Sequence, residues 1–303
     1  MYNITCRNAE HLRRPRVRLG FHVSIAGGFA RVPERARYLG CETLQVFSRS
    51  PRAWRAQPIQ ESEAEAFRQP LSAARITPVV VHTPYLLNLG SADRSLGKRS
   101  TDVLAEELRR AAQLGAQYVV THLGGSPEPP ARVLRRIARR LDTALRLSPP
   151  DVLLLLENSA GAGSLVGAPF SDLAEIVAHS RFPARLGLCL DTAHALAAGY
   201  EVRTREGLAQ TLAQLDAALG LHRLRLLHGN DSKSDLGSHV DRHWHIGRGA
   251  IGLAGFRNIL SHPKLQPLPL IMETPRRTIA DDRRNMRVMK RLRSECQDAR
   301  SGR

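Results

Sequence analysis

The chain has 303 residues, enough for two average domains or for one α/β barrel, and its 42% hydrophobic content is typical of a protein with a large core. No apolar run approaches the ~18 residues of a membrane span, and the N-terminus lacks the apolar stretch of a secretory signal, which argues against a membrane or exported protein. The net charge of +17 comes almost entirely from arginine. It indicates either a polyanionic partner, above all nucleic acid, or a genome rich in arginine codons.

In chain order, strands alternate with amphipathic helices. Apolar runs predict eight strands, at 17–24, 43–49, 77–83, 118–124, 151–158, 186–192, 223–230 and 267–274. Helical periodicity between them predicts helices at 32–40, 62–76, 101–116, 131–147, 172–180 and 206–219. Eight such strand–helix units predict an α/β fold, the closed (β/α)8 TIM barrel, with its active site at the carboxyl ends of the strands.

No linker-like stretch interrupts this rhythm, so we predict a single domain over residues 17–293. The basic leader 1–16 and the tail 294–303, which follows a short basic helix, are expected to be disordered. Two connections, 84–100 and 231–252, are longer than a barrel requires, and long loops at the catalytic face usually carry function. The four cysteines are widely spaced and form no CxxC pair, which favours free thiols in a reducing, cytoplasmic setting.

Six of the predicted strands end on a histidine or an acidic residue, and this repetition is the strongest functional signal. The six residues are His82, His122, Glu157, Asp191, His228 and Glu273, and His194, Asp241 and His243 follow in the adjoining loops. The carboxyl ends of barrel strands meet on one face, so these side chains are expected to converge. Imidazole and carboxylate groups without thiolate suit zinc of the hydrolytic kind, and nine ligands exceed what one metal needs. We therefore predict a multinuclear metal site.

The motifs around these residues resemble those of the endonuclease IV family, which are zinc-dependent apurinic/apyrimidinic endonucleases on an α/β barrel. The similarity extends from about Val17 to Arg293. Its main motifs are VHTPYLLNLGS (81–91), ENSAGAG (157–163), LDTAHALAAGY (190–200), HGNDSK (228–233), DRHWHIGRGAIG (241–252) and METP (272–275), with GFHVSIAGG (20–28) and SPRAWRAQP (50–58) in addition.

The resemblance implies three zinc ions per chain and assigns their ligands. His82, His122 and Glu157 match the first site; Glu157 also bridges to a second site, completed by Asp191, His228 and Glu273; His194, Asp241 and His243 match the third. The implied reaction is hydrolysis of the phosphodiester 5′ to an abasic site, leaving 3′-OH and 5′-deoxyribose phosphate ends. A hydroxide attacks in line, and Glu157 is the catalytic residue that orients it.

Arg52, Tyr85 and Leu86 match positions where this family inserts side chains into DNA beside the lesion, although they could also be ordinary loop residues. The implied partner is damaged double-stranded DNA, with no membrane, no organic cofactor and a monomeric enzyme. The chain departs from the family pattern at Gly229, at Trp244–His245 and at Arg248. These departures affect the shape and charge of the 231–252 loop and leave every ligand in place.

Two other readings stay open at this point. A sugar isomerase or epimerase on a related divalent-metal barrel also carries His, Asp and Glu at its strand ends, but it needs neither a third site nor a charge of +17. A non-catalytic DNA-binding barrel would have no need for complete sets of metal ligands. Metal stoichiometry separates the first alternative, and turnover on abasic DNA separates both.

Overall fold

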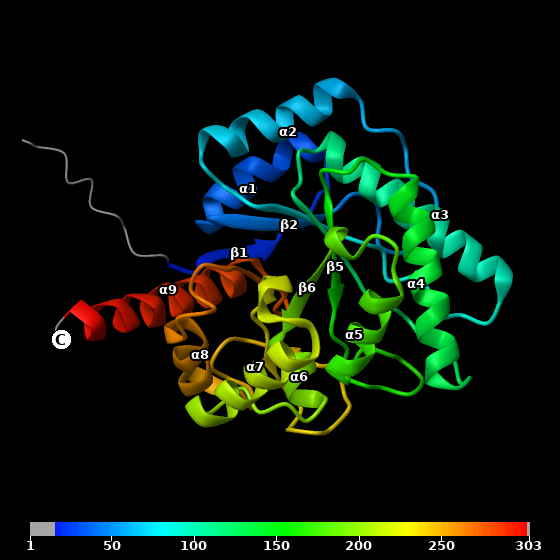
Figure 1. The fold of residues 1–303 in the computed structure, drawn as a ribbon. Helices are drawn as coiled ribbons and strands as arrows, with labels where there is room; N and C mark the ends of the chain where they lie inside the picture. The colour runs from blue at the N-terminus through cyan, green and yellow to red at the C-terminus, as the bar shows by residue number, and fades with distance from the viewer. Residues whose placement is uncertain (1–15, 302–303) are drawn as a thin grey trace, which may run out of the picture.

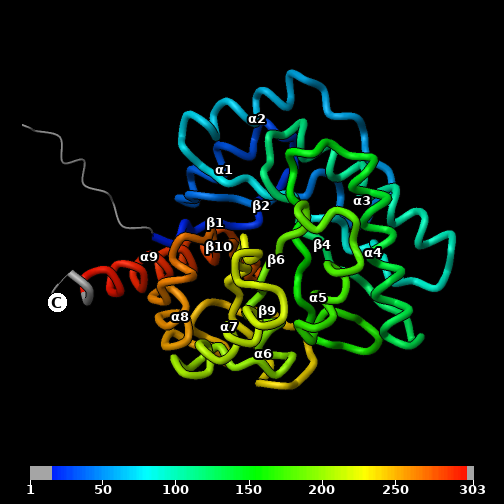
Figure 2. Tube along the Cα trace, in the orientation of Figure 1, coloured from blue at the N-terminus to red at the C-terminus, as the bar shows by residue number. Residues whose placement is uncertain are grey.

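The computed structural model describes residues 16–301 and contains a closed barrel of eight parallel strands surrounded by helices (Figure 1). The strands are β1 (Arg18–His22), β2 (Thr43–Phe47), β3 (Val79–His82), β4 (Tyr118–Thr121), β5 (Leu153–Glu157), β6 (Leu186–Asp191), β7 (Leu224–His228) and β10 (Pro269–Met272). The barrel closes at β1, which pairs with β2 on one side and with β10 on the other (Figure 2). The predicted (β/α)8 fold and all eight predicted strands are confirmed, each strand being shorter than predicted.

A layer of six apolar side chains fills the barrel and places the candidate ligands above it. Side chains alternate along a strand, so residues two positions apart point to the same side. Each member of the layer lies two residues before one of the six candidate ligands at the strand ends. The layer consists of Val80, Val120, Leu155, Cys189, Leu226 and Ile271. The same alternation that buries these residues therefore directs the ligands toward the barrel axis.

The helices cover the outside of the barrel and bury one apolar face each, as Val133, Ile137 and Leu141 of α4 show. They are α1 (Val32–Leu39), α2 (Glu61–Ala73), α3 (Arg94–Gln113), α4 (Pro130–Arg146), α5 (Phe170–His179), α6 (Thr192–Ala197), α7 (Arg205–Leu219), α8 (Gly252–Ser261) and α9 (Ile279–Ser301), with 3₁₀ turns η1 (Phe29–Arg31), η2 (Pro183–Arg185) and η3 (Leu221–Arg223). Within residues 16–301, none of these helices is long and apolar enough to cross a membrane.

The structure corrects the predicted loop after the third strand. Helix α3 begins at Arg94 rather than at residue 101, so the 84–100 loop ends at Asp93. The Asp93 carboxylate starts the helix by accepting hydrogen bonds from the main-chain N–H groups of Ser95 (2.7 Å) and Leu96 (3.2 Å). A polar first turn that contains a glycine carries no apolar periodicity, which is why the pattern missed it.

The second long loop also contains structure that the sequence pattern did not reveal. Two short strands, β8 (Asp231–Ser232) and β9 (His243–Trp244), form an antiparallel pair within it. Helix α8 begins at Gly252, where the predicted loop ends. Helix α6, after β6, and helix α8 are both absent from the predicted helices.

The predicted ends of the domain are partly outside the described residues. Residues 1–15 and 302–303 are not described, so the expected disorder of the leader concerns only Arg16 here, whose guanidinium lies 3.0 Å from the Glu42 carboxylate. At the other end, the expectation of a disordered tail from residue 294 is wrong for residues 294–301, which continue α9. Glu295 supports this last part of the helix through ion pairs with Arg257 (3.0 Å) and Arg291 (3.6 Å).

Candidate metal centre

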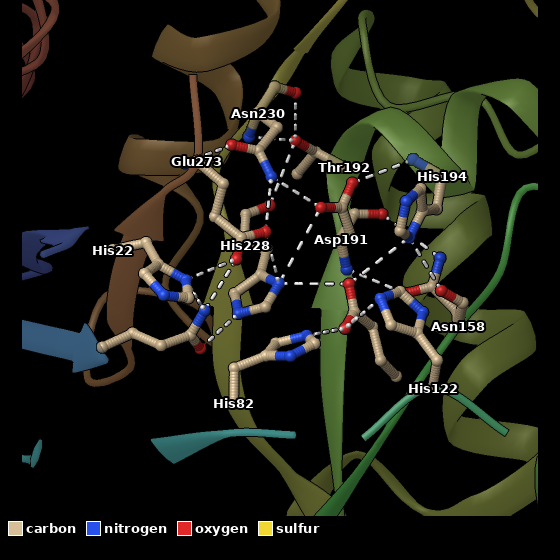
Figure 3. A network of polar contacts seen from close by, with 12 residues as sticks. His22, His82, His122, Asn158, Asp191, Thr192, His194, His228, Asn230 and Glu273 are labelled. Carbon is tan, nitrogen blue, oxygen red and sulfur yellow. Dashed lines mark hydrogen bonds and ion pairs between the residues drawn. The ribbon is translucent and has the colours of Figure 1, made fainter. Parts of the chain in front are cut away.

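All nine candidate ligands lie together at the carboxyl ends of the strands, and Figure 3 shows how most of them face one another. His82, Glu157, Asp191 and His228 are the last residues of β3, β5, β6 and β7, and His122 and Glu273 follow β4 and β10 directly. The remaining three are His194 in α6, Asp241 in the loop after β8, and His243 at the start of β9.

Asp191 and His194 are brought together by the start of a helix. Asp191 is the N-cap of α6, and its Oδ1 accepts a hydrogen bond from the His194 main-chain N–H at 2.9 Å. The side chains of an N-cap residue and of the third helical residue lie next to each other in this arrangement. The DTAH sequence therefore places a carboxylate and an imidazole beside one pocket.

The ligand atoms form three groups, and in each group they lie within 4.8 Å of one another. The groups are His82, His122 and Glu157; Glu157, Asp191, His228 and Glu273; and Asp191, His194 and His243. Asp241 lies beside the last group, with its carboxylate 3.1 Å from His194 Nε2 and 3.4 Å from His243 Nε2. The structure thus brings together every ligand that the sequence predicted.

Glu157 connects the first two groups through its two oxygens. Its Oε2 lies 3.2 Å from His82 Nε2 and 3.6 Å from His122 Nε2. Its Oε1 lies 3.1 Å from His228 Nδ1. The side chain is buried, so the two oxygens are held facing two separate sets of donors.

Four of the histidines have one ring nitrogen committed to a carbonyl oxygen. Nδ1 of His82, His194 and His243 donates to the main-chain oxygens of Thr83 (2.7 Å), Asn158 (2.9 Å) and Glu273 (3.2 Å), and Nε2 of His228 donates to the Gln45 side chain (2.9 Å). A carbonyl can only accept, so each imidazole carries its hydrogen on that side. The other nitrogen of each ring then presents a lone pair to a carboxylate, which is repulsive unless a proton or a metal lies between them.

The charges at the centre also favour a cation between the imidazoles and the carboxylates. Burial alone would raise the pKa of Glu157, but the imidazoles of His122, His228 and His194 hold it well below its usual range. Burial likewise opposes the charged form of His194, yet the Asp191, Asp241 and Glu157 carboxylates raise the pKa of this imidazole well above its usual value. A divalent cation bound among these groups would balance the charge of the carboxylates.

The donor set fits zinc. It consists of imidazole nitrogens and carboxylate oxygens, has no thiolate, and is oriented by carbonyl acceptors as metal-binding histidines usually are. One buried nitrogen, Nε2 of His243, has no hydrogen-bond partner and points between the Asp191 and Asp241 carboxylates at 3.5 and 3.4 Å. A buried polar atom without a partner is costly, and coordination to a metal would satisfy it.

Gln45 and Asn230 orient the candidate ligands and were not predicted from the sequence. Gln45 Nε2 donates to Glu273 Oε1 (2.7 Å), while its Oε1 accepts from His228 (2.9 Å), so one amide holds two ligands. Asn230 Nδ2 donates to Asp191 (2.6 Å), and its Oδ1 accepts from the Glu273 main-chain N–H (2.7 Å). For Gln45, the sequence offered one signal, a polar residue in the middle of the apolar strand TLQVF. The apolar pattern that predicts the strand assigns no role to this residue.

We expect Gln45→Leu to weaken zinc binding by roughly tenfold to a hundredfold, because residues that orient metal ligands contribute about this much. The leucine fills the same space but can neither donate to Glu273 nor accept from His228. Zinc retained during titration with a chelator measures the effect. Gln113→Leu, at the C-terminal end of α3, is the matched control, and equal zinc retention by the two variants would contradict the role of Gln45.

Tyr85, Leu86 and Arg52 lie in the loops that follow β3 and β2, on the face of the barrel that carries the candidate ligands. Tyr85 is 64% exposed and packs edge-on against Phe47, with ring centroids 5.3 Å apart, and its ring lies 6.1 Å from that of His82. Desolvation of the phenol, followed by the charges of Glu273 and Glu157, raises the pKa of Tyr85 to about 12, so the ring stays neutral. Arg52 is exposed and Leu86 is partly exposed.

Asp231 holds the loop that carries the departures from the family pattern. Its buried carboxylate accepts hydrogen bonds from the main-chain N–H groups of Gly247 (2.8 Å), Gly249 (3.0 Å) and Ile251 (3.0 Å). A Cβ atom at Gly249 would lie 2.2 Å from the Ser232 carbonyl oxygen, so only glycine allows this close approach. In β9 of the same loop, the Trp244 ring lies under the Lys233 ammonium, 4.7 Å from the ring centroid.

Comparison with known proteins identifies the family. Residues 33–294 match a family described as a xylose isomerase-like TIM barrel. The chain is 44% identical over 280 residues to a protein named probable endonuclease 4 from Methanosphaerula palustris, and the match covers 91% of this chain and 98% of the relative. The crystal structure of endonuclease IV from Thermus thermophilus superposes with a TM-score of 0.83 at 42% identity, covering 92% and 99% of the two chains.

A solved D-tagatose 3-epimerase-like protein also superposes, with a TM-score of 0.72 at 19% identity over 92% of this chain and 99% of that one. Identity this low shows a shared fold and nothing about the reaction. The resemblance to the endonucleases is more than twice as strong in sequence and extends over nearly the full length of both chains. The chain therefore belongs to the endonuclease IV family.

Proposed function

We propose that this protein is an apurinic/apyrimidinic endonuclease with three zinc ions, which hydrolyses the phosphodiester 5′ to an abasic site in duplex DNA and leaves 3′-OH and 5′-deoxyribose phosphate ends. The observation that carries the proposal is the position of Glu157, whose two oxygens face two different ligand groups. A carboxylate in this position could serve two metals at once, and clustered metals suit the hydrolysis of a phosphodiester.

Two groups in the structure support the first two ligand sets; the third set follows the family pattern, in which Asp241 takes the place of Asp191 beside His194 and His243. His82, His122 and Glu157 would hold the first zinc; Glu157, Asp191, His228 and Glu273 the second; and His194, Asp241 and His243 the third. When bound, the zinc ions would lower the pKa of an attacking water and neutralise charge on the phosphate and on the leaving oxygen.

The protein itself positions the reacting groups. Glu157 is buried between two ligand groups, so its carboxylate can accept a hydrogen bond from the attacking water and hold it in line with the scissile bond. Gln45 and Asn230 keep Glu273 and Asp191 from rotating, so the centre is organised before DNA arrives. Arg52, Tyr85 and Leu86 would fill the base stack beside an extruded abasic nucleotide.

The alternative of a sugar epimerase is less well supported by this site. It would use one metal, and it would leave His194, Asp241 and His243 without a role although His194 and His243 each commit one ring nitrogen to a carbonyl. The charge of +17 also has an explanation in the binding of a polyanion such as DNA, which a small neutral sugar does not provide.

The test is cleavage of a duplex that contains one stable, reduced abasic analogue. We expect a single cut on the 5′ side of the analogue and a 3′-OH end that a DNA polymerase extends. A reduced analogue cannot undergo β-elimination, so a lyase leaves it intact. His82→Ala provides the inactive control, and failure of the wild-type protein to cut this duplex would sink the proposed reaction.

We expect purified protein to contain close to three zinc equivalents by elemental analysis, because three sets of ligands can be assembled from the described residues. Activity should survive modest EDTA in the assay, since zinc held by several buried ligands leaves slowly. After reconstitution with excess zinc, one or two equivalents would contradict the three-site assignment and favour the isomerase-type reading.

A further inference from the structure

A buried charged cluster lies beside the segment that carries Arg52. It consists of Ser48 and Arg49, just after β2, and of Glu107 and Arg110 on α3, and each of the four residues is at most 6% exposed. Arg49 Nε donates to the Glu107 carboxylate. Ser48 Oγ donates to Glu107 (2.7 Å) and accepts from Arg110 Nε (2.8 Å), so the four side chains form one connected network.

The cluster donates hydrogen bonds to main-chain carbonyls of residues 48–58, both before and after Arg52. Before Arg52, Arg110 donates to the Ser48 carbonyl. After it, Arg49 Nη1 donates to the Trp54 carbonyl (2.9 Å) and Arg110 Nη1 to the Gln57 carbonyl (2.7 Å).

The segment has little else to hold it. Residues 50–58 contain neither helix nor strand. The Ala53 N–H donates to the Ser50 carbonyl (3.1 Å), but the Trp54 and Gln57 carbonyls depend on partners from outside the segment. A cavity of about 260 Å³ is lined by residues of the segment and of the cluster, and also by Ile25, Gly28 and Phe29 after β1. The one large side chain that anchors the segment is Trp54, which packs against the core and lies under the Arg99 guanidinium, 4.4 Å from the ring centroid. Apolar packing therefore does not account for the position of the whole segment.

A buried charged network is a costly way to hold a loop. Taking ions out of water is unfavourable, and well-packed apolar residues of similar volume often serve the stability of a fold as well or better. The guanidinium groups offer something that apolar residues lack, namely several donors in a fixed plane that reach separate carbonyls at once. The arrangement thus suits a requirement for geometry more than a requirement for stability.

We propose that Arg49, Glu107 and Arg110 are positioning residues for damage recognition: they hold the 50–58 segment in its DNA-bound shape before DNA is present, so that Arg52 enters the stack without a loop having to be ordered. This inference rests on the proposed function, because it takes Arg52 as a DNA-contacting residue. An Arg52 side chain that is already in position improves binding to abasic duplex, where the base stack is interrupted. Binding to intact duplex depends on phosphate contacts elsewhere.

The test uses Arg110→Lys, which keeps the charge but cannot reach Ser48 and Gln57 together. We expect the dissociation constant for abasic duplex to rise roughly tenfold, and that for intact duplex to stay within about twofold at fixed salt. The reason is that a less ordered 50–58 segment affects only the insertion of Arg52. Arg109→Lys is the matched control, since Arg109 is the exposed neighbour on the same helix. Zinc content should be unchanged in both variants.

A double-mutant cycle with Arg52→Ala separates positioning from a general structural effect. If Arg110 acts through the segment, Arg110→Lys should no longer change the ratio of the two dissociation constants once Arg52 is alanine. A change of the same size in that background, or an equal loss of affinity for both duplexes, overturns the inference.

Limited trypsin digestion keeps the inference testable even if Arg110→Lys folds poorly. The free wild-type protein should resist cleavage after Arg52 and Arg55 as well in the absence of DNA as in its presence. Rapid cleavage there that stops on addition of abasic duplex would show that DNA orders the segment, and would overturn the inference. Failure of the proposed function is a separate result, because the wild-type protein would then not cut abasic duplex at all.

Discussion

Glu157→Gln should lower the single-turnover rate of cleavage of abasic duplex by roughly a hundredfold to a thousandfold, the range seen when a preorganised group of a catalytic centre is lost. The amide keeps the shape of the side chain, but only one of its two arms retains an oxygen lone pair. The glutamine side chain can therefore present an oxygen to one of the two ligand groups and not to both. Most of the affinity for DNA comes from phosphate contacts, so the dissociation constant should change by no more than about threefold.

The measurement pairs single-turnover kinetics with a binding assay on an uncleavable duplex. Glu65→Gln, at an exposed position of α2, makes the same chemical change away from the centre and should leave both constants unaltered. Cleavage by Glu157→Gln at nearly the wild-type rate would show that the bridging role of Glu157 is wrong.

Replacing both Tyr85 and Leu86 with alanine should reduce the preference for abasic over intact duplex by roughly tenfold or more, since stacking on a side chain is worth about 1–3 kcal/mol per base. Intact DNA has to lose a base stack before such side chains can enter, and abasic DNA largely does not. The tyrosine is 64% exposed and stands at the edge of the centre, where an aromatic ring has no role in the core. Zinc content should remain unchanged.

Two dissociation constants at the same salt concentration measure this preference, because non-specific affinity varies steeply with ionic strength. Tyr38→Ala is the matched control, since Tyr38 is a similarly exposed tyrosine on α1 whose ring lies under the Arg283 guanidinium. An unchanged ratio in the double variant would mean that Tyr85 and Leu86 are ordinary loop residues and that discrimination resides elsewhere, for example in the Trp244 loop.

The barrel and the convergence of the nine candidate ligands were predictable because both arise from local patterns. A run such as VVVH is apolar on both faces until its last residue, which identifies a buried parallel strand and the polar side chain at its carboxyl end. The rule that these ends meet on one face then brings His82 and Glu273 together, although they are 191 positions apart (273 − 82).

The parts that were not predictable depend on contacts between distant segments. Gln45 is one polar residue in an apolar strand, and only the closed barrel reveals that it holds His228 and Glu273. Glu107 looks like any charged residue of an amphipathic helix until α3 packs beside the end of β2 and buries it against Arg49. Helix α8 begins with glycine and has a short apolar stripe, so its tertiary position, more than its propensity, makes it helical.

The last strand of the barrel links the folding of the chain to the order in which its ligand groups are completed. His82, His122 and Glu157 come from three consecutive strands, so they are all present once the chain has been synthesised through β5. The central group has to wait for Glu273, directly after β10, and it is β10 that pairs with β1 and closes the sheet. A chain that stops before residue 269 therefore has neither a closed barrel nor a complete central group. Only a polypeptide that has been synthesised through its final strand and has closed its barrel can assemble the full centre.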